Sequence, residues 1–343
     1  MAVYTEVGPG ALAAFLADYD LGPALSLAPI AEGIENSNYR LSTPRGAYVL
    51  TLFERRVDPA ELPWFLGLMR HLAARGVACP QPVPGRDGAA LRGLAGRPAA
   101  ICTFLPGDWP RGGEAALTPA RCAAVGTALA ALHEAGRGYA PGRRNGLGPP
   151  AWGPLLARCA ETGADPALCA ELEGHLGRVL GAWPAEGDLP RGHVHADLFP
   201  DNVFFDGAGD GGAGERLTGI IDFYFACTDH LAYDLAVALS AWGFDAAAGR
   251  LDPARAGAML AAYEAARPLR RAEREALPVL LAGAALRFLL TRLHDWTNTP
   301  PGALVTRKDP AEYLARLRAF ARDGADAVPW PAAAAAAPAD AHA

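Results

Sequence analysis

The hydrophobic positions of the first hundred residues follow two patterns, one typical of strands and one of helices. The segments "NYRLS" and "AYVLTLF" are rich in aromatic and branched residues, and the "TPRG" between them is a turn signal. Residues 39–53 therefore predict a β-hairpin. Leu62, Phe65 and Met69 recur at helical spacing and predict a helix that ends at the next glycine.

The rest of the chain has mainly the periodicity of helices. Prolines and glycines interrupt residues 106–113, after which Thr118 and Asp165 each precede a proline, as helix N-caps often do. Only residues 192–223 have the pattern of strands, and a glycine-rich turn at 207–214 separates them. Alanine and proline dominate the end of the chain, and this composition predicts disorder.

These elements predict an α+β protein with two lobes. The N-terminal lobe, residues 1–105, is expected to be a small antiparallel sheet with a helix, and the C-terminal lobe, residues 106–323, to be mainly helical. Residues 324–343 are expected to form a disordered tail. A chain of 343 residues exceeds the size at which single hydrophobic cores usually stop growing, which agrees with two lobes.

Composition and charge exclude several classes of protein. The formal net charge is −6, so no general nucleic-acid binding surface is expected. No run reaches the roughly 18 uninterrupted apolar residues of a membrane span, and the N-terminus lacks the pattern of a signal peptide. The six cysteines contain no CxxC pair, which indicates reduced, mostly buried thiols. We therefore expect a cytoplasmic protein without membrane or nucleic-acid partners.

The candidate chemistry lies in "HADLFPDNVFF", residues 195–205, and in the aspartate of "IDFYF". If the strand after Asn202 pairs with the strand before Asp222, these two side chains lie at the same end of a hairpin. Magnesium prefers hard oxygen ligands and uses few protein ligands besides substrate phosphates, so this pair is suited to a Mg²⁺-nucleotide. Asp197, in the loop just before, can then accept the proton of a hydroxyl that attacks the γ-phosphate.

The same residues resemble a known family. His195, Asp197 and Asn202 fill the pattern HxDxxxxN, and a strand that ends in Asp222 follows, as in the catalytic and metal-binding loops of the protein-kinase-like fold. "HADLFPDN" is closer to the aminoglycoside and choline phosphotransferase branch than to protein kinases, which have HRD and DFG. "AEGIENSNYRLST", "YVLTLFE" and "RFLLTRLHDWTNTPPGALVTRKDP" resemble the homoserine kinases of that branch. The resemblance implies a two-lobe kinase fold, ATP and Mg²⁺ as cofactors, and phosphorylation of the L-homoserine hydroxyl on the route to threonine.

The resemblance also implies residue roles in the catalytic segment. Asp197 is the expected catalytic base, and Asn202 and Asp222 are the expected metal ligands. His195 is expected to orient the loop, and Asp234 to support it from the start of a helix.

A nucleotide site is implied in the N-terminal lobe. "EGIENSN" takes the place of the phosphate-binding loop, and "ICTFLPG" takes the place of the linker whose backbone meets adenine. A plain hairpin turn explains the glycine and asparagines of the first segment almost as well. The expected nucleotide-binding residues are Gly33, Asn36, Ser37, Asn38, Thr51, Thr103 and Phe104.

One position departs from the fold. The third strand normally carries a lysine that contacts the α- and β-phosphates, whereas this chain has Thr51 there. A threonine donates one hydrogen bond but supplies no charge, so Glu61 in the next helix has no obvious ionic partner. Either Arg55, Arg56 or a residue from elsewhere substitutes, or the metal neutralises more of the phosphate charge.

The sequence does not identify the residues that bind the carboxylate and ammonium groups of homoserine. Its carboxylate requires a cation, and Arg287, Arg292, Arg307 and Lys308 are the candidates. Asp229 is a further candidate for substrate contact.

Other functions are also open. His193 and His195 alternate on a strand as zinc ligands can, but the sequence offers no third ligand. A sibling phosphotransferase could act on choline, an aminoglycoside or a sugar alcohol, although the helical lobe has no dense acidic run for a polycation. The missing lysine would also suit a non-catalytic nucleotide-binding protein.

Overall fold

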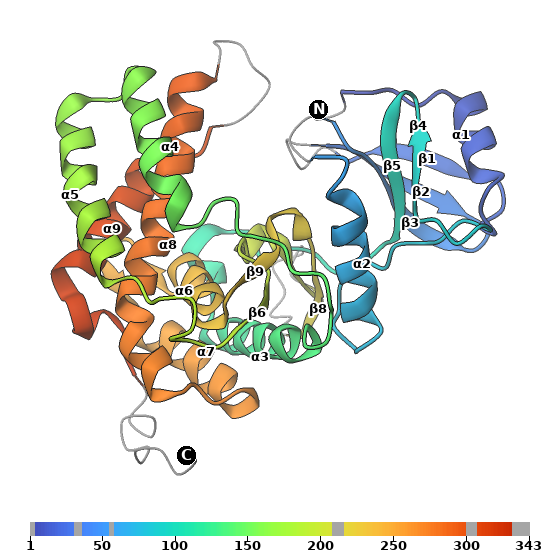
Figure 1. The fold of residues 1–343 in the computed structure, drawn as a ribbon. Helices are drawn as coiled ribbons and strands as arrows, with labels where there is room; N and C mark the ends of the chain where they lie inside the picture. The colour runs from blue at the N-terminus through green and yellow to red at the C-terminus, as the bar shows by residue number, and fades with distance from the viewer. Residues whose placement is uncertain (1–3, 31–35, 55–57, 208–215, 300–306, 331–343) are drawn as a thin grey trace. The chain divides into compact units, whose positions relative to one another are not determined.

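The computed structural model describes residues 4–30, 36–54, 58–207, 216–299 and 307–330 (Figure 1). The chain divides into two compact units. The first unit comprises Met1–Pro106 and Gly219–Tyr224, and the second comprises Gly107–Thr218 and Phe225–Ala343. A short segment from the middle of the chain therefore belongs with the N-terminal residues.

A five-stranded antiparallel sheet forms the first unit, with the strand order β1-β2-β3-β5-β4. Thr51 pairs with Asn38 and Leu41 with Tyr48, so the predicted hairpin is confirmed. The unit also contains two helices. Its elements are α1 (Pro9–Leu16), β1 (Ser26–Pro29), β2 (Ser37–Thr43), β3 (Gly46–Leu52), α2 (Leu62–Ala73), β4 (Leu91–Leu94) and β5 (Arg97–Thr103).

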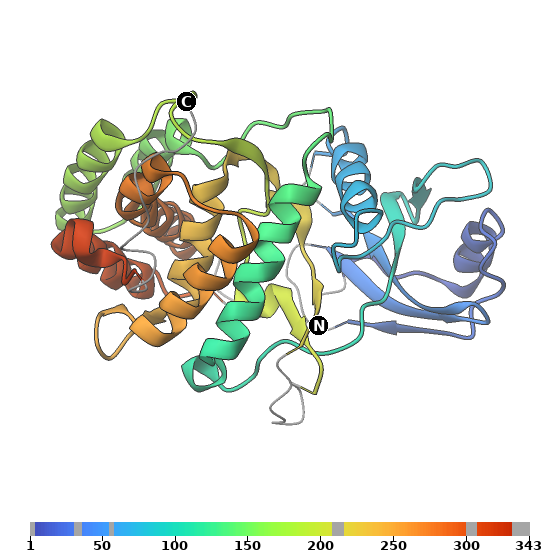
Figure 2. The same ribbon diagram turned by 90° about the horizontal axis from the view of Figure 1, so that it is seen from below.

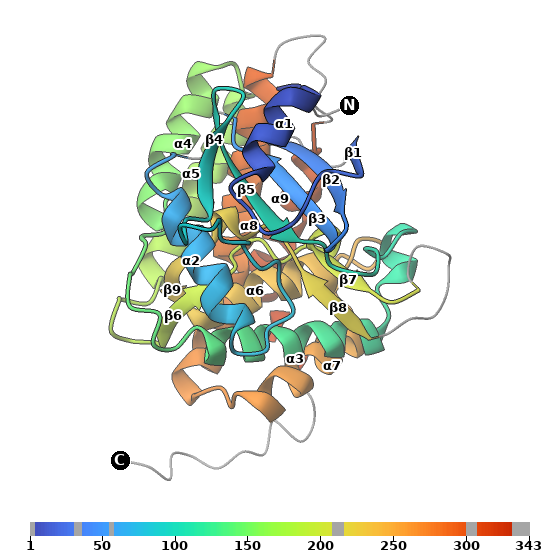
Figure 3. The same ribbon diagram turned by 90° about the vertical axis from the view of Figure 1, so that its right-hand side faces the viewer.

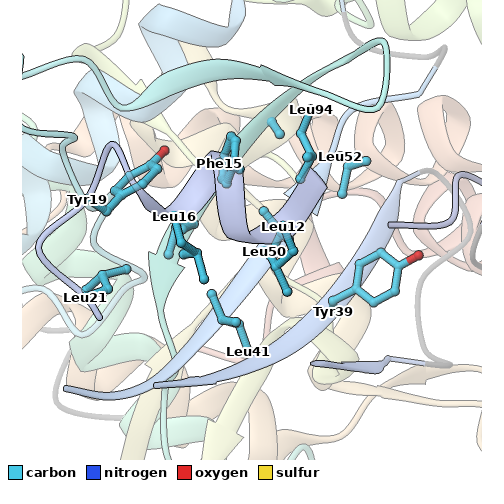
Figure 4. Packing of buried hydrophobic residues seen from close by; sticks show 12 residues of the cluster. Leu12, Phe15, Leu16, Tyr19, Leu21, Tyr39, Leu41, Leu50, Leu52 and Leu94 are labelled. Atoms are coloured by element: carbon cyan, nitrogen blue, oxygen red, sulfur yellow. The ribbon is translucent and has the colours of Figure 1, made fainter. Parts of the chain in front are cut away.

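Helix α1 packs on the sheet through its apolar face. Leu12, Phe15 and Leu16 join Leu41 and Leu50 in one buried cluster (Figure 4). No side chain caps the N-terminus of α1. Burial of such side chains contributes about 1.5–3 kcal/mol each, so this core, rather than a cap, fixes the helix on the sheet.

The second unit is mainly helical. Its helices are α3 (Pro119–Ala135), α4 (Pro149–Glu161), α5 (Pro166–Ala182), α6 (Leu231–Trp242), α7 (Pro253–Ala266), α8 (Arg271–Asn298) and α9 (Ala311–Asp323), with short 3₁₀ turns η1 (Gly113–Ala116), η2 (Pro200–Asn202), η3 (Phe223–Phe225) and η4 (Gly324–Ala327). The strands are β6 (Arg191–Val194), β7 (Val203–Phe205), β8 (Leu217–Ile220), β9 (Cys227–His230), β10 (Phe244–Asp245) and β11 (Arg250–Leu251), paired as β6-β9, β7-β8 and β10-β11. β8 and η3 extend across the boundaries of the segment Gly219–Tyr224.

Helices α3 and α7 lie side by side in this unit (Figure 3). A Cβ atom at Gly126 of α3 would lie 2.3 Å from the backbone oxygen of Met259 in α7. Only glycine permits this backbone approach. Helices α4 and α5 form a second neighbouring pair (Figure 2).

Helix α8 is the buried centre of the unit. Leu286, Leu289 and Leu290 are inaccessible to solvent, and Pro278 lies within the helix. In the described part of the chain, α8 is the one helix long and apolar enough to cross a membrane, and 72% of its apolar window is buried inside the protein. Packing against its neighbours therefore accounts for its composition.

The helix N-caps predicted at Thr118 and Asp165 are confirmed. Thr118 accepts a hydrogen bond from the Arg121 amide at 3.2 Å, and Asp165 accepts from the Ala167 and Leu168 amides at 2.7 and 3.0 Å. All six cysteines are free and buried, as expected. Burial raises the pKa of the Cys79 thiol to about 12, so this thiol stays protonated at neutral pH.

Residues 324–330 were predicted to belong to a disordered tail. Residues 324–330 are ordered by packing: Ala327 and Val328 are only 5% and 4% exposed, and the Arg274 guanidinium lies over the Trp330 ring. The prediction that disorder starts at Gly324 is therefore wrong for these residues, because composition does not reveal the apolar surface that receives them. Residues 331–343 lie outside the described residues.

Candidate active site

A sharply bent loop, residues 195–202, follows strand β6. Ala196 has a φ of +62°, in the left-handed region that residues with a Cβ rarely adopt. Asp234, in the first turn of α6, holds this bend: its Oδ2 accepts the His195 amide and its Oδ1 the Ala196 amide, both at 2.7 Å. Trp242 donates from its indole nitrogen to the Leu198 oxygen at 2.9 Å. One buried carboxylate thus satisfies two amides that the bend leaves unpaired.

A buried chain of hydrogen bonds extends from Asp234. His133 Nε2 lies 3.1 Å from Asp234 Oδ2, and His133 Nδ1 lies 2.7 Å from the Tyr263 hydroxyl. Arg267 donates to that hydroxyl at 3.1 Å and to Glu273 Oε1 at 2.8 Å. Arginine can only donate, so the Tyr263 oxygen accepts from Arg267. The ionised Asp234 carboxylate can only accept, so His133 Nε2 carries a proton that is directed at it.

The charge on Asp234 is stabilised despite complete burial. Burial by itself raises the pKa of this carboxyl group, but the His133 hydrogen bond, the nearby His133 and His195 rings and the His195 amide together hold the pKa below its usual value. Asp234 therefore stays ionised and keeps accepting both amides at neutral pH.

Asp197 lies in the bent loop with its carboxylate held from two sides. Asn202 Nδ2 donates to the Asp197 backbone oxygen at 2.8 Å and to Oδ2 at 3.2 Å, while Arg287 Nη1 lies 3.4 Å from Oδ1. The backbone amide of Asp197 donates to His195 Nδ1 at 3.2 Å. The side chain remains 18% exposed. The carboxylate is thus oriented yet still able to accept a hydrogen bond from a hydroxyl.

The amide of Asn202 is turned by these contacts. Because Nδ2 is directed at Asp197, Oδ1 is directed away from it, and Oδ1 accepts from no residue in the described part of the chain. This neutral oxygen is the type of donor that magnesium takes in proteins.

Asp222 belongs to the first unit and is exposed. Its φ of +64° is again in the left-handed region. The Ile220 amide donates to the Ala78 oxygen at 2.8 Å, and the Tyr224 ring packs edge-on against Phe65, so the residues on both sides of Asp222 are tied to the first unit. Non-glycine residues in such conformations concentrate at functional sites.

The start of β2 and the end of β3 carry the polar residues expected at the nucleotide. Thr51 donates from Oγ1 to Asn38 Oδ1 at 2.8 Å, and the Glu54 amide donates to Asn36 Oδ1 at 3.3 Å. The Ser37 hydroxyl donates to Glu54 Oε1 at 2.6 Å and accepts two N-terminal amides, so it is fully used within the unit. Gly33, Arg55 and Arg56 lie outside the described residues.

The charge missing at Thr51 is not replaced on the same strand. The described ion pair nearest in sequence joins Arg97 of β5 to Glu54, with Nε and Oε2 3.0 Å apart. The guanidinium is 36% exposed and Glu54 only 6%. Arg97 is therefore one cation that this part of the sheet presents.

The linker after β5 has its first backbone donors occupied. The Thr103 amide donates to the Gln81 oxygen at 2.9 Å, and the Phe104 amide to the Ala47 oxygen at 3.2 Å. The next amide, that of Leu105, has no partner among the described residues.

Two candidate substrate residues, Asp229 and Arg292, have hydrogen-bond partners other than Asp197. The β6-β9 register places Asp229 opposite Gly192, upstream of the loop, and Asn145 donates to its Oδ2 at 2.7 Å. Arg292 is bonded to Glu312 at 2.8 Å. His193 lies near the oxygens of Gly136 and Pro141, and no three His, Cys, Asp or Glu cluster among the described residues as metal ligands.

Sequence reasoning missed His133 and Tyr263. The signal for His133 was a polar residue beside Leu129 and Leu132 on the apolar face of a predicted helix. Tyr263 lies on α7, which the periodicity did not indicate.

Comparison with known proteins gives strong sequence matches. The model of the "Phosphotransferase enzyme family" matches residues 26–274. Homoserine kinase of Gluconacetobacter diazotrophicus is 61% identical over 321 residues, covering 93% of this chain and 96% of the relative. Homoserine kinase of Granulibacter bethesdensis is 60% identical over 320 residues, covering 93% and 96%.

Solved structures share the fold at low sequence identity. Amicoumacin kinase hAmiN in complex with AMP-PNP, Ca²⁺ and Ami aligns with a TM-score of 0.63 at 18% identity, over 93% of this chain and 94% of that one. A microcompartment-associated aminopropanol kinase aligns with a TM-score of 0.59 at 20% identity, over 89% and 93%. The predicted two-lobe kinase-like fold class is confirmed.

Proposed function

The chain belongs to the homoserine kinases of the phosphotransferase enzyme family, and we propose that it transfers the γ-phosphoryl group of ATP to the hydroxyl of L-homoserine. The product is O-phospho-L-homoserine, an intermediate on the route to threonine. The observation that carries the proposal is the Asp197 carboxylate, fixed by Asn202 and Arg287 on a loop that Asp234 holds.

Asp197 is the general base of this reaction. Its carboxylate orients the attacking hydroxyl and accepts the proton as the bond to phosphorus forms. Asn202 keeps Oδ2 in place, and His195 fixes the backbone of Asp197 through its ring nitrogen. Because phosphoryl transfer depends mainly on positioning and charge neutralisation, a rigid loop matters as much as the basicity of the carboxylate.

Asn202 and Asp222 would hold Mg²⁺. The free Oδ1 of Asn202 and the exposed carboxylate of Asp222 are oxygen donors of the kind and number that a magnesium-nucleotide site uses. When bound, magnesium neutralises charge on the transferring phosphoryl group.

The nucleotide contacts lie in the first unit. Asn36, Asn38 and Thr51 present amide and hydroxyl groups to the phosphates, while Ser37 contributes through its backbone because its hydroxyl is occupied. In the linker formed by Thr103 and Phe104, the open amide that follows, on Leu105, is the donor to adenine. Such a protein works on small metabolites in the cytoplasm, without nucleic-acid or membrane partners.

The test is an ADP-release assay with MgATP that compares L-homoserine, choline, kanamycin and no acceptor. Turnover stimulated only by homoserine is the expected result. Stimulation by choline or kanamycin instead would assign a sibling phosphotransferase, and no turnover with any acceptor would favour a non-catalytic nucleotide-binding protein.

A further inference from the structure

Four cations of the second unit could meet a substrate carboxylate, and three of them are already engaged elsewhere. Arg292 Nη1 donates to Glu312 at 2.8 Å and to the Asp309 oxygen at 3.1 Å. Arg307 donates to the Trp296 oxygen at 3.0 Å and stacks on the Trp296 ring. Lys308 pairs with Asp201 at 3.3 Å and is 57% exposed, so water and Asp201 already satisfy its charge.

Arg287 differs from these three. Its side chain is only 4% exposed, and its guanidinium carbon lies 3.8 Å from the centroid of the Phe288 ring. Nη1 donates to the Ala196 oxygen at 3.1 Å and to Asp197 Oδ1 at 3.4 Å. Nε and Nη2 bond to no residue in the described part of the chain, and neither is fully enclosed. A nearly buried cation therefore keeps unused donors beside the general base.

Leaving those donors unused is unfavourable. A buried guanidinium without compensating hydrogen bonds retains much of its desolvation cost, and its one carboxylate contact is at the long end of the hydrogen-bond range. A planar guanidinium matches a carboxylate through two parallel N–H donors, which Nε and Nη2 would supply. A carboxylate on the bound acceptor would complete the site.

We propose that Arg287 binds the carboxylate of the acceptor through Nε and Nη2 and so selects amino-acid alcohols over amino alcohols that lack a carboxylate. This inference rests on the proposed phosphorylation of homoserine. In homoserine a short carbon chain separates the hydroxyl from the carboxylate. Arg287 can therefore face the carboxylate while the neighbouring Asp197 faces the hydroxyl.

The competing role is purely positional, because Arg287 also holds the Ala196 oxygen. The two roles make different predictions. If Arg287 only holds the loop in place, its removal lowers the turnover of every acceptor by the same factor. If Arg287 also binds the acceptor carboxylate, its removal lowers turnover more for acceptors that carry a carboxylate than for those that do not.

The experiment measures kcat/KM for L-homoserine and for 3-amino-1-propanol, which is homoserine without its carboxylate. In Arg287→Gln we expect a loss of about 10²- to 10³-fold for homoserine. For 3-amino-1-propanol we expect a smaller loss, of at most about 10-fold, because the contacts of Arg287 with Asp197 and the Ala196 oxygen are weakened for both acceptors. Arg287→Lys, which keeps the charge but not the paired donors, should fall between the wild type and Arg287→Gln. An equal loss for both acceptors would overturn the proposal.

A second measurement uses inhibition. L-2-aminobutyrate has the carboxylate and ammonium of homoserine but no hydroxyl, so it should inhibit the wild-type enzyme and lose most of this inhibition in Arg287→Lys. Unchanged inhibition would also overturn the proposal. Arg318→Gln is the control variant, because it removes an arginine from a distant bidentate pair with Glu171 and should leave both acceptors unaffected.

Failure of the inference is distinguishable from failure of the proposed function. A wild-type enzyme that does not use homoserine would contradict the function itself. Homoserine turnover with an unchanged ratio between the two acceptors in Arg287→Gln and Arg287→Lys would remove only the role of Arg287. Circular dichroism of each variant shows whether it folds.

Discussion

The loop around Asp197 and the end of strand β3 around Thr51 neutralise charge in different ways. In the loop, the completely buried Asp234 accepts two backbone amides and a histidine proton. At the end of strand β3, Thr51 and Asn38 share one neutral hydrogen bond, and Arg97 of the nearby Arg97–Glu54 pair is 36% exposed. A buried ionic support is costly to break, whereas neutral or solvated contacts are replaceable. We therefore expect the loop to be far less tolerant of substitution.

The largest effect should come from the reacting groups. Asp197→Ala removes the general base and should lower kcat by about 10²- to 10⁴-fold. Asp222→Ala should lower it at least as much, because Thr51 supplies no charge and the metal must neutralise more of the phosphate. The measurement is turnover at saturating ATP and magnesium. If only Asp197→Ala impaired turnover, the proposed importance of the metal would be contradicted.

The second-largest effect is expected when Asp234, the buried carboxylate that supports the loop, is substituted. Asp234→Asn replaces one acceptor with an amide that donates, which leaves a loop amide unpaired, and should lower the free energy of unfolding by about 3 kcal/mol. Urea unfolding followed by fluorescence measures this loss. A change below about 1 kcal/mol would mean that the bend at Ala196 does not depend on Asp234.

The same substitution gives a pH signature. The pKa of Asp234 is lower in the folded protein than in the unfolded chain, so its stabilisation is present above the unfolded pKa of about 4 and is lost as the pH falls through the folded value. The stability difference between wild type and Asp234→Asn should therefore be present above about pH 4 and narrow as the pH falls below it. A difference that stays constant down to pH 3 would contradict the stabilised charge.

A smaller effect is expected from Thr51, near the end of strand β3. Thr51→Val removes one neutral hydrogen bond and should cost about 1 kcal/mol of stability, with kcat lowered less than about 10-fold because no charge is lost. Kinetics with varied ATP and urea unfolding test both values. A loss of kcat as large as that of Asp197→Ala would show that the hydroxyl does more than support Asn38.

The smallest effect should come from an exposed residue of the same loop. Asp201→Asn removes the ion pair with Lys308. The side chain of Asp201 is 49% exposed and that of Lys308 is 57% exposed. Such pairs contribute about 0–1 kcal/mol. Urea unfolding at low and high salt measures the change. A loss equal to that of Asp234→Asn would contradict the view that burial separates the two aspartates.

Local signals predicted much of the fold. The alternation around "TPRG" predicted the hairpin of β2 and β3, and a side-chain oxygen before a proline predicted the starts of α3 and α5. Two helices of the second unit went unidentified, since α4 begins with two prolines and contains a third, and α7 is rich in alanine without a clear apolar face. Their stability comes from packing, which a local pattern does not report.

For the candidate site, the sequence by itself determined the groups: the spacing of His195, Asp197 and Asn202 and the absence of a lysine at Thr51 are facts of the chain. Only the tertiary structure decided which of several similar cations lies beside the general base. Arg287 and Arg292 lie on the same helix, but Glu312 of α9 neutralises Arg292, while Arg287 is enclosed beside the loop. Burial and pairing depend on residues distant in sequence, so no local pattern can distinguish two arginines on one helix.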